Sequence, residues 1–101
     1  MDLRVIDNPD LDRYEARDAE TVAGFAAYQR AGKLIVFTHT EVDPSYEGKG
    51  VGSTLVRGAL DDARAQGLPV LPLCPFVKGW IGKHPDYADN VYASPASTAK
   101  D

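Results

Sequence analysis

The chain has 101 residues, of which 44% are hydrophobic and 26% are charged. This length and balance suit one globular domain with one modest core, and they exclude an intrinsically disordered chain. The net charge of −4 argues against a general nucleic-acid-binding surface, which would be basic, so we expect no nucleic-acid partner.

The first part of the sequence predicts an antiparallel meander of strands. Turn residues at Asn8-Pro9-Asp10 end the first strand, and a compact loop at Ala31-Gly32-Lys33 predicts a hairpin. The run after that loop is rich in β-branched and aromatic residues and is the strongest strand signal. Four strands are expected, at Leu3–Ile6, Arg13–Arg17, Val22–Arg30 and Leu34–Val42.

The character of the sequence then changes to that of a helix. From Val51 to Ala63, apolar residues recur at the three- and four-residue spacing of one helix face. Gly67 is a natural C-terminal cap and Pro69 prevents continuation. Gly58, inside the helix, costs roughly 1 kcal/mol relative to alanine and is compatible with close packing on a sheet.

A second strand and a second helix follow. The apolar run Leu68–Leu73 suits a buried strand that runs parallel to the strand before the helix, which completes a βαβ unit. Pro75 opens a short helix over Phe76–Lys83. The fold class is therefore α+β, with a mixed, mostly antiparallel sheet, a central βαβ unit and a short C-terminal helix. We expect one domain over residues 1–92 and a disordered tail over 93–101.

The segment from Val42 to Ser53 joins the strongest strand to the first helix. It holds three glycines in five positions, at 48, 50 and 52. The first amides of a helix have no intrahelical partner, and glycine lets a bulky anion come close to them. The segment is typical of a pyrophosphate-binding turn, and the alternative is a tight turn without a ligand.

The spacing of these glycines excludes two common phosphate-binding motifs. A P-loop needs four residues between its first glycine and Gly-Lys-Ser/Thr, whereas Lys49 directly follows Gly48. A dinucleotide fingerprint needs Gly-x-Gly-x-x-Gly and an acidic residue about 20 positions later, where Val70 stands.

Two segments of the sequence resemble a known family. The first segment resembles motif A of the GCN5-related N-acetyltransferases and reads Val42-x-Pro44-x-x-Glu47-Gly48-Lys49-Gly50-Val51-Gly52-x-x-Leu55. The second segment resembles the small, single-domain YjdJ-like subfamily of that family. It reads Leu71-Pro72-Leu73-Cys74-Pro75-Phe76-Val77, followed by His84-Pro85-Asp86-Tyr87-Ala88-Asp89. One residue departs from motif A, because Glu47 stands where the family has Arg or Gln.

The resemblance implies an acetyl-CoA-dependent N-acetyltransferase, or alternatively a CoA-binding module with little turnover. The partners would be acetyl-CoA and an amine acceptor. The pantetheine arm would pair with the strand end near Glu41 and Val42. The pyrophosphate would lie on the motif A amides, contributed by Gly48, Lys49, Gly50, Val51, Gly52 and Ser53.

Acetyl transfer needs a base for the amine and an acid for the leaving thiolate. His39 and Glu41 share one strand face, so His39 is a candidate base and Glu41 a candidate base or orienting group. Cys74 ends the next strand and is a candidate acid or nucleophile. The alternatives are a structural histidine, a solvated glutamate and an inert buried cysteine. The family's usual tyrosine acid has no counterpart where Trp80 and Ile81 stand.

The remaining features concern compartment and assembly. No apolar run approaches the roughly 20 residues of a membrane span, and the first residues carry no apolar signal segment. Cys74 is the single cysteine, which fits a reducing cytosol, and His39 and His84 lack the spacing of a zinc site. We therefore expect a cytoplasmic monomer with no membrane association and no metal.

Overall fold

A computed structural model describes residues 1–92 of the chain, so the tail predicted over 93–101 lies outside the described residues. Five strands form one sheet in the order β1-β2-β3-β4-β5. Their bounds are Leu3–Asn8 for β1, Arg13–Asp18 for β2, Thr21–Ala31 for β3, Leu34–Val42 for β4 and Val70–Pro72 for β5.

The sheet confirms the predicted meander. The strands β1 to β4 pair with their sequence neighbours antiparallel, and β5 pairs with β4 parallel. The last strand, β5, is shorter than the predicted Leu68–Leu73, because only Val70–Pro72 reach strand geometry. The βαβ unit is therefore formed by β4, the first helix and β5, with β5 as the outermost strand.

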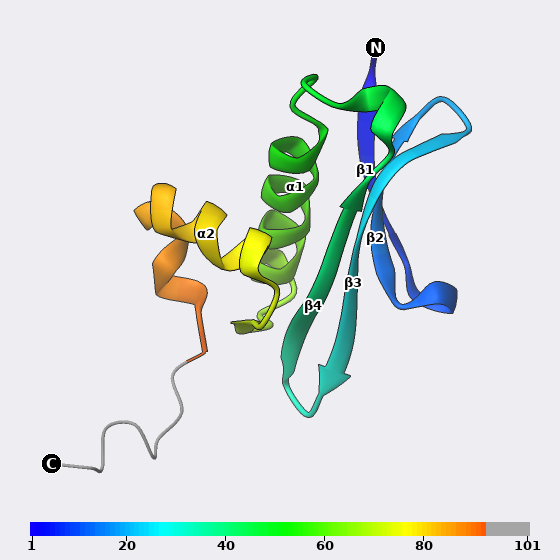
Figure 1. Cartoon of the computed structure of the whole chain (residues 1–101). Helices are drawn as coiled ribbons and strands as arrows, with labels where there is room; N and C mark the ends of the chain where they lie inside the picture. Colours follow the sequence, from blue (N-terminus) through cyan, green and yellow to red (C-terminus); the bar gives the residue numbers. More distant parts are fainter. Residues whose placement is uncertain (93–101) are drawn as a thin grey trace, which may run out of the picture.

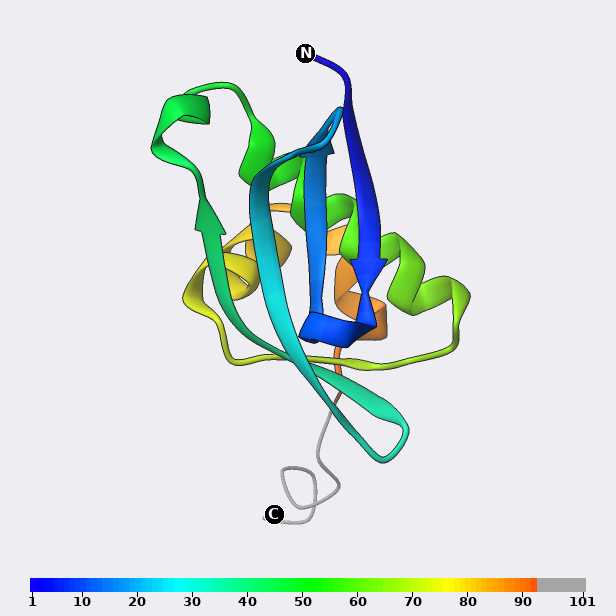
Figure 2. The ribbon, with the colours of Figure 1, turned by 90° about the vertical axis from the view of Figure 1, so that its right-hand side faces the viewer.

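Both helices lie on one face of the sheet. The first, α1, spans Val51–Ala65, and the second, α2, spans Pro75–Lys83. Short 3₁₀ turns occupy Pro9–Leu11, Pro44–Tyr46 and Pro85–Asn90. Figure 1 shows α1 and α2 on the same side of the strands, and Figure 2, turned by 90°, shows the opposite face of the sheet uncovered. None of the helices described over residues 1–92 is long and apolar enough to cross a membrane.

The core lies between the sheet and α1. Large side chains from the sheet, among them Tyr14, Ile35 and Phe37, meet the apolar face of α1, and all three are at most 1% exposed. Each fully buried side chain of this kind contributes roughly 1.5–3 kcal/mol by leaving water. The helix face was predicted from its periodicity, and it is buried as expected at Val51, Leu55, Val56, Ala59, Leu60 and Ala63.

The glycine inside α1 has a packing reason. A Cβ on Gly58 would lie 2.7 Å from Cβ of Val5 in β1, closer than real Cβ contacts allow. The helix can therefore approach the first strand only because position 58 has no side chain. Gly67 has φ of +72° just beyond the helix, which confirms the predicted C-terminal cap.

The uncovered face of the sheet carries a buried ion cluster. Glu15 is 1% exposed, and its carboxylate accepts hydrogen bonds from Asn8, Arg13 and Arg17. Burial alone would raise the pKa of this carboxyl, but the hydrogen bonds from Arg17, Arg13 and Asn8 outweigh it and lower the pKa. Glu15 is thus held ionised between two guanidinium groups.

Candidate functional site

The glycine turn leads from the end of β4 into α1. Gly48 and Gly50 have φ of +78° and +77°, the left-handed region that favours glycine. At the start of the turn, Asp43 accepts hydrogen bonds from Ser45 N and Ser45 Oγ, at 2.9 and 2.7 Å. These bonds lower the pKa of Asp43 and fix the exit of the chain from β4.

The first amides of α1 are left open by this turn. Gly50 is the N-cap residue, and no side chain caps the helix there. The amides of Val51, Gly52 and Ser53 therefore point out of the helix N-terminus, where the helix dipole favours an anion. The side chain of Val51 is buried in the core, so only its backbone can serve a ligand. Open amides of this kind are what an anion site requires, and the anion site itself stays a prediction from the sequence.

Two predicted residues of the turn also hold α1 against α2. A Cβ on Gly52 would lie 2.7 Å from the ring of Phe76, so Gly52 allows this close contact. The indole Nε1 of Trp80 donates to Ser53 Oγ at 2.9 Å. The Ser53 hydroxyl still has a proton to donate, so it can bind an anion while it accepts from Trp80.

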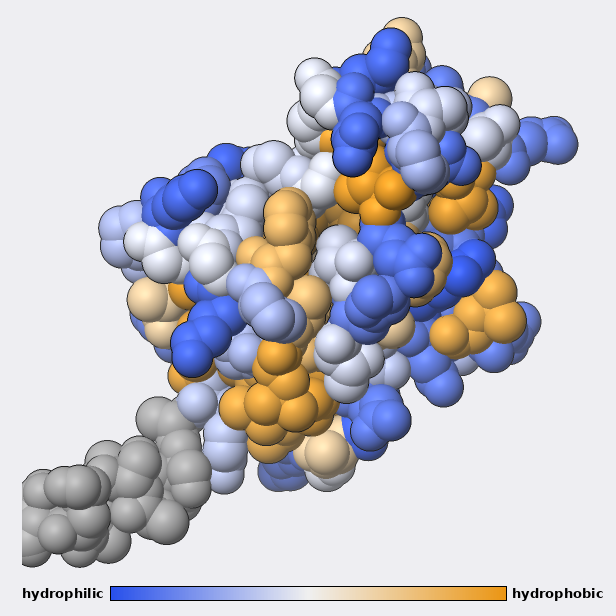
Figure 3. Space-filling view, in the orientation of Figure 1, coloured by the Kyte–Doolittle hydropathy of each residue, from blue (hydrophilic) through white to orange (hydrophobic). Residues whose placement is uncertain are grey.

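A cavity opens beside this junction between the two helices. It has a volume of about 430 Å³ and includes the aromatic rings of Phe76 and Trp80 in its lining. Lys83 and His84 also line it, and His84 stacks on Trp80 with ring centroids 3.7 Å apart. Figure 3 shows a strip of hydrophobic surface on this face of the molecule, near the start of α2. The exposed side chains of Leu73 and Phe76 belong to that region of the chain.

The strands β4 and β5 separate beside this cavity. Pairing between them is confined to Ile35, Val36 and Phe37 of β4. The carbonyl of Phe37 then accepts from both Leu73 N and Cys74 N, at 3.0 and 2.9 Å, and β5 turns away into α2. Within the described residues, the remainder of β4, Thr38–Val42, has no partner on the β5 side. Its free backbone groups can pair with an extended ligand.

A bulge in β4 marks the same point. Ala27 pairs with His39 and Tyr28 pairs with Phe37, so Thr38 is an extra residue opposite β3. A bulge re-aims the side chains that follow it. It turns His39 and Glu41 to the uncovered face of the sheet, where the ring of His39 lies 6.1 Å from the ring of Phe25.

His39 and Glu41 lie on one strand face, as their alternation predicted, and they form a pair there. The distance from His39 Nε2 to Glu41 Oε2 is 2.7 Å, and the two side chains are 58% and 60% exposed. A carboxylate can only accept, so Nε2 carries the shared proton and Nδ1 of a neutral imidazole keeps a lone pair. This geometry gives His39 the form of a general base that Glu41 orients.

Cys74 lies apart from this pair. This residue is 3% exposed, and its Sγ is 3.3 Å from Thr40 Oγ1, on the side of β4 opposite to His39 and Glu41. The structure thus brings His39 and Glu41 together and places Cys74 at the opening between β4 and β5.

Among residues 1–92, no group of three His, Cys, Asp or Glu side chains is arranged to hold a metal ion.

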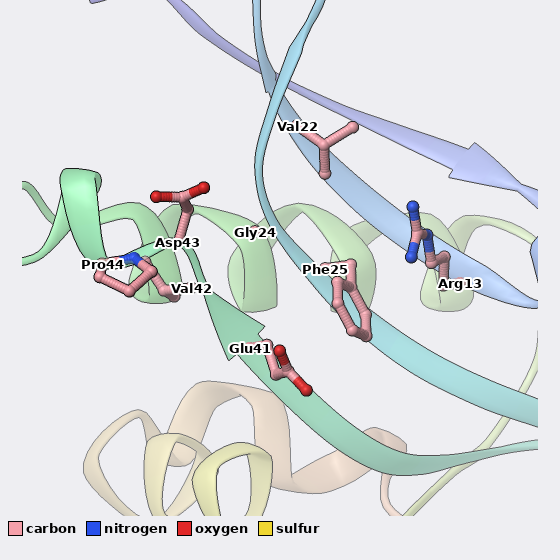
Figure 4. A pocket seen from close by; sticks show the side chains of 8 residues that line it. All are labelled: Arg13, Val22, Gly24, Phe25, Glu41, Val42, Asp43 and Pro44. Atoms are coloured by element: carbon pink, nitrogen blue, oxygen red, sulfur yellow. The ribbon is translucent and has the colours of Figure 1, made fainter.

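A second cavity lies on the uncovered face next to Glu41. Its volume is about 310 Å³, and Figure 4 shows Phe25 between Arg13 and Glu41. The lining residues are Arg13, Val22, Gly24, Phe25, Glu41, Val42, Asp43 and Pro44.

Arg13 and Phe25 were not recognised from the sequence as site residues. The guanidinium carbon of Arg13 lies 4.6 Å from the centroid of the Phe25 ring. A signal existed, because Arg13, Glu15 and Arg17 alternate along one strand and so share a face. The sequence could not reveal that Phe25 of the next strand lies beside them.

The comparisons with known proteins agree with this geometry. A family model described as GCN5-related N-acetyl-transferase matches residues 13–90, which include the glycine turn, His39 and Cys74. Among curated proteins, the chain is similar to N-alpha-acetyltransferase RimI of Mycobacterium tuberculosis, with 43% identity over 53 residues. That alignment covers 48% of this chain and 34% of the relative, so the chain spans about a third of the relative's length.

Among solved structures, the chain is similar to the NMR solution structure of a GCN5-like protein from Staphylococcus aureus. The TM-score is 0.69, with 22% identity over 98% of this chain and 97% of that chain. At this identity the likeness concerns the fold, and it confirms the predicted α+β class. Because the family model matches most of the chain, this protein belongs to the GCN5-related N-acetyltransferase family.

Proposed function

We propose that this protein transfers the acetyl group of acetyl-CoA to a primary amine. One observation carries the proposal: the chain runs from the free edge of β4 through the glycine turn to the uncapped start of α1. An extended arm and a pyrophosphate, joined as they are in CoA, suit these two neighbouring features. The similarity to RimI, which is named as an N-alpha-acetyltransferase, supports an amine acceptor.

The proposed CoA site uses backbone groups and one cavity. The pyrophosphate would bind the amides from Gly48 to Ser53, and the exposed Lys49 adds a cation beside them. The pantetheine arm would pair with β4 near Glu41 and Val42. The 430 Å³ cavity between α1 and α2 is apolar enough for an aromatic base, and Lys83 offers a cation for a phosphate.

The proposed chemistry begins with deprotonation of the amine. Nδ1 of His39 accepts a proton from the ammonium group, and Glu41 stabilises the imidazolium that results. The neutral nitrogen attacks the thioester carbonyl, and the carbon–sulfur bond breaks as the intermediate collapses. The CoA thiolate then takes a proton, for which the Cys74 thiol is the candidate donor, at the opening between β4 and β5.

Two measurements test this function. Calorimetry with CoA measures binding, and release of the free CoA thiol, followed with a panel of primary amines, measures turnover. Intact-mass spectrometry with acetyl-CoA also reports any acetyl group on Cys74. An absence of CoA binding at millimolar concentration would refute the proposal.

A CoA-binding module with little turnover is the second candidate. The observation that favours it is the burial of Cys74, which is 3% exposed and whose Sγ lies 3.3 Å from Thr40 Oγ1. Binding of CoA without any acetylated product from the amine panel would support this alternative, and clear turnover would exclude it.

A further inference from the structure

The cavity on the uncovered face of the sheet combines opposite charges with an apolar floor. Glu41 and Asp43 line its β4 end, and Arg13 lines its β2 end. The ring of Phe25, in the strand between them, forms the floor. A cavity that is anionic at one end and cationic at the other selects a ligand with both charges.

The positive end is fixed in place and not neutralised. Two guanidinium groups, those of Arg13 and Arg17, share the single carboxylate of Glu15, so the cluster carries a net charge of +1. Arg13 reaches Glu15 through Nε at 2.8 Å, and its guanidinium lies over the ring of Phe25. In the described part of the chain, no acceptor contacts its two terminal nitrogens, which keep the donors that bind a carboxylate.

The negative end lies beside the proposed base. Glu41 Oε2 faces His39, which leaves the other carboxylate oxygen for a ligand ammonium group. Asp43 is held ionised by Ser45. An amine bound here would stand beside the pair of Glu41 and His39 and close to the bulged stretch of β4 that borders the proposed thioester site.

From these contacts we propose that this cavity is the acceptor site and that it takes a small zwitterionic amine. This inference rests on the proposed function. The ammonium group binds at Glu41, and the carboxylate binds at Arg13. The backbones of β2 and β4 are two strand spacings apart, roughly 10 Å. Glu41 pairs with Phe25, whereas Arg13 pairs with Ala27, so the two charged residues are also offset along the strands. The acceptor is therefore longer than an α-amino acid: an ω-amino acid or a dipeptide with several bonds between its charges.

Atoms and protons balance in the proposed acetyl transfer. The ammonium group loses one proton to Nδ1 of His39, and the nitrogen forms a bond to the acetyl carbon. The carbon–sulfur bond breaks, the nitrogen loses its second proton and the CoA thiolate gains one. The products are an N-acetylated carboxylate, CoA and one proton released through His39. The product has lost the charge that Glu41 binds, which favours its release.

The first test uses acetylation rates. Glycine, β-alanine, 4-aminobutyrate, 5-aminopentanoate and glycylglycine are compared with the amide of each compound and with putrescine. We expect an optimum at an intermediate length and a kcat/KM at least about tenfold higher for each acid than for its amide. Equal rates for acids and amides, or a preference for putrescine or for a peptide with a blocked carboxylate, would overturn the proposal.

The second test uses matched variants. Arg13→Gln and Arg17→Gln each remove one guanidinium from Glu15, but only Arg13 lines the cavity. In R13Q the preference for acid over amide should fall about tenfold, with the KM for acetyl-CoA unchanged, and R17Q should keep the preference. The same loss in both variants would overturn the role of Arg13.

The third test does not depend on turnover. In amide NMR spectra of the ¹⁵N-labelled full chain without CoA, 4-aminobutyrate should shift the signals of Phe25, Glu41 and Val42, and its amide should not. Shifts in a chain that acetylates nothing would support the binding site while the proposed function fails. The absence of shifts, in a chain that does acetylate amines, would overturn the site alone.

Discussion

The two halves of β4 behave as different structures within one strand. Ile35 to Phe37 pair on both sides, and Ile35 and Phe37 are at most 1% exposed. His39 to Val42 pair on one side only, and His39 and Glu41 are more than half exposed. The bulge at Thr38 and the end of β5 divide the halves. The first half therefore stabilises the sheet, whereas the exposed side chains and free backbone edge of the second half can contact ligands.

The largest expected effect is on stability, in the first half. Phe37→Ala removes a fully buried ring from the contact between the sheet and α1, and the unfolding free energy should fall by about 3–5 kcal/mol. Urea denaturation followed by circular dichroism measures this loss. A loss below about 1 kcal/mol would mean that the first half of β4 is not the core strand described above.

The next effect is on rate, in the second half. His39→Gln removes the proposed base from an exposed position, so kcat should fall roughly a hundredfold or more. The unfolding free energy should change by less than about 0.5 kcal/mol. Acetyl transfer and urea denaturation, measured on the same preparation, separate the two quantities. A large loss of stability in this variant would show that the second half is structural as well.

A smaller effect is expected where β4 leads into the glycine turn. Gly50→Val places a β-branched residue at φ of +77°, which strains the turn by roughly 1–3 kcal/mol and misplaces the amides that open α1. The affinity for CoA, measured by calorimetry, should fall at least about tenfold.

The control for this variant is Gly82→Ala in α2. Gly82 has open space around its Cα and no positive φ. The affinity for CoA should remain unchanged there, and the helix should gain up to about 1 kcal/mol. If both variants bind CoA equally well, the turn does not hold the pyrophosphate.

The smallest effect concerns the link between β4 and Cys74. Thr40→Val removes the hydroxyl that lies 3.3 Å from Cys74 Sγ, and kcat should fall a few-fold, because a hydrogen bond to sulfur is weak. Thr38→Val is the matched control, since its hydroxyl bonds to the carbonyl of Ala27 instead. Equal kcat values in the two variants would contradict the proposed role of Cys74 as proton donor.

Local patterns were sufficient to predict most of the fold. The β-branched run from Leu34 to Val42, the helical periodicity after Val51 and the cap at Gly67 are each encoded within a few residues, and each was confirmed. The extent of β5 was not predictable in the same way. Only Val70–Pro72 pair with β4. Beyond them, the amides of Leu73 and Cys74 both donate to the carbonyl of Phe37, and the chain turns away into α2.

The candidate site was predictable where neighbours in sequence are neighbours in space. The alternation of His39 and Glu41 was sufficient to predict that they share a strand face, and in the structure they form a pair there. The position of Cys74 depends on the bulge at Thr38 and on where β5 leaves the sheet, so its contact with Thr40 could not be foreseen. The proximity of Arg13 and Phe25 depends on the register between β2 and β3, which no local pattern specifies.

The bond between Trp80 and Ser53 has an optical consequence. Trp80 is the single tryptophan of the chain, so its indole is the dominant source of intrinsic fluorescence. The indole bonds to Ser53 in the first turn of α1 and stacks on His84, so its emission reports on the junction between the two helices. A ligand that engages the Ser53 hydroxyl or enters the neighbouring cavity changes the surroundings of this one chromophore. The protein therefore carries a built-in, label-free signal for occupancy of its proposed CoA site.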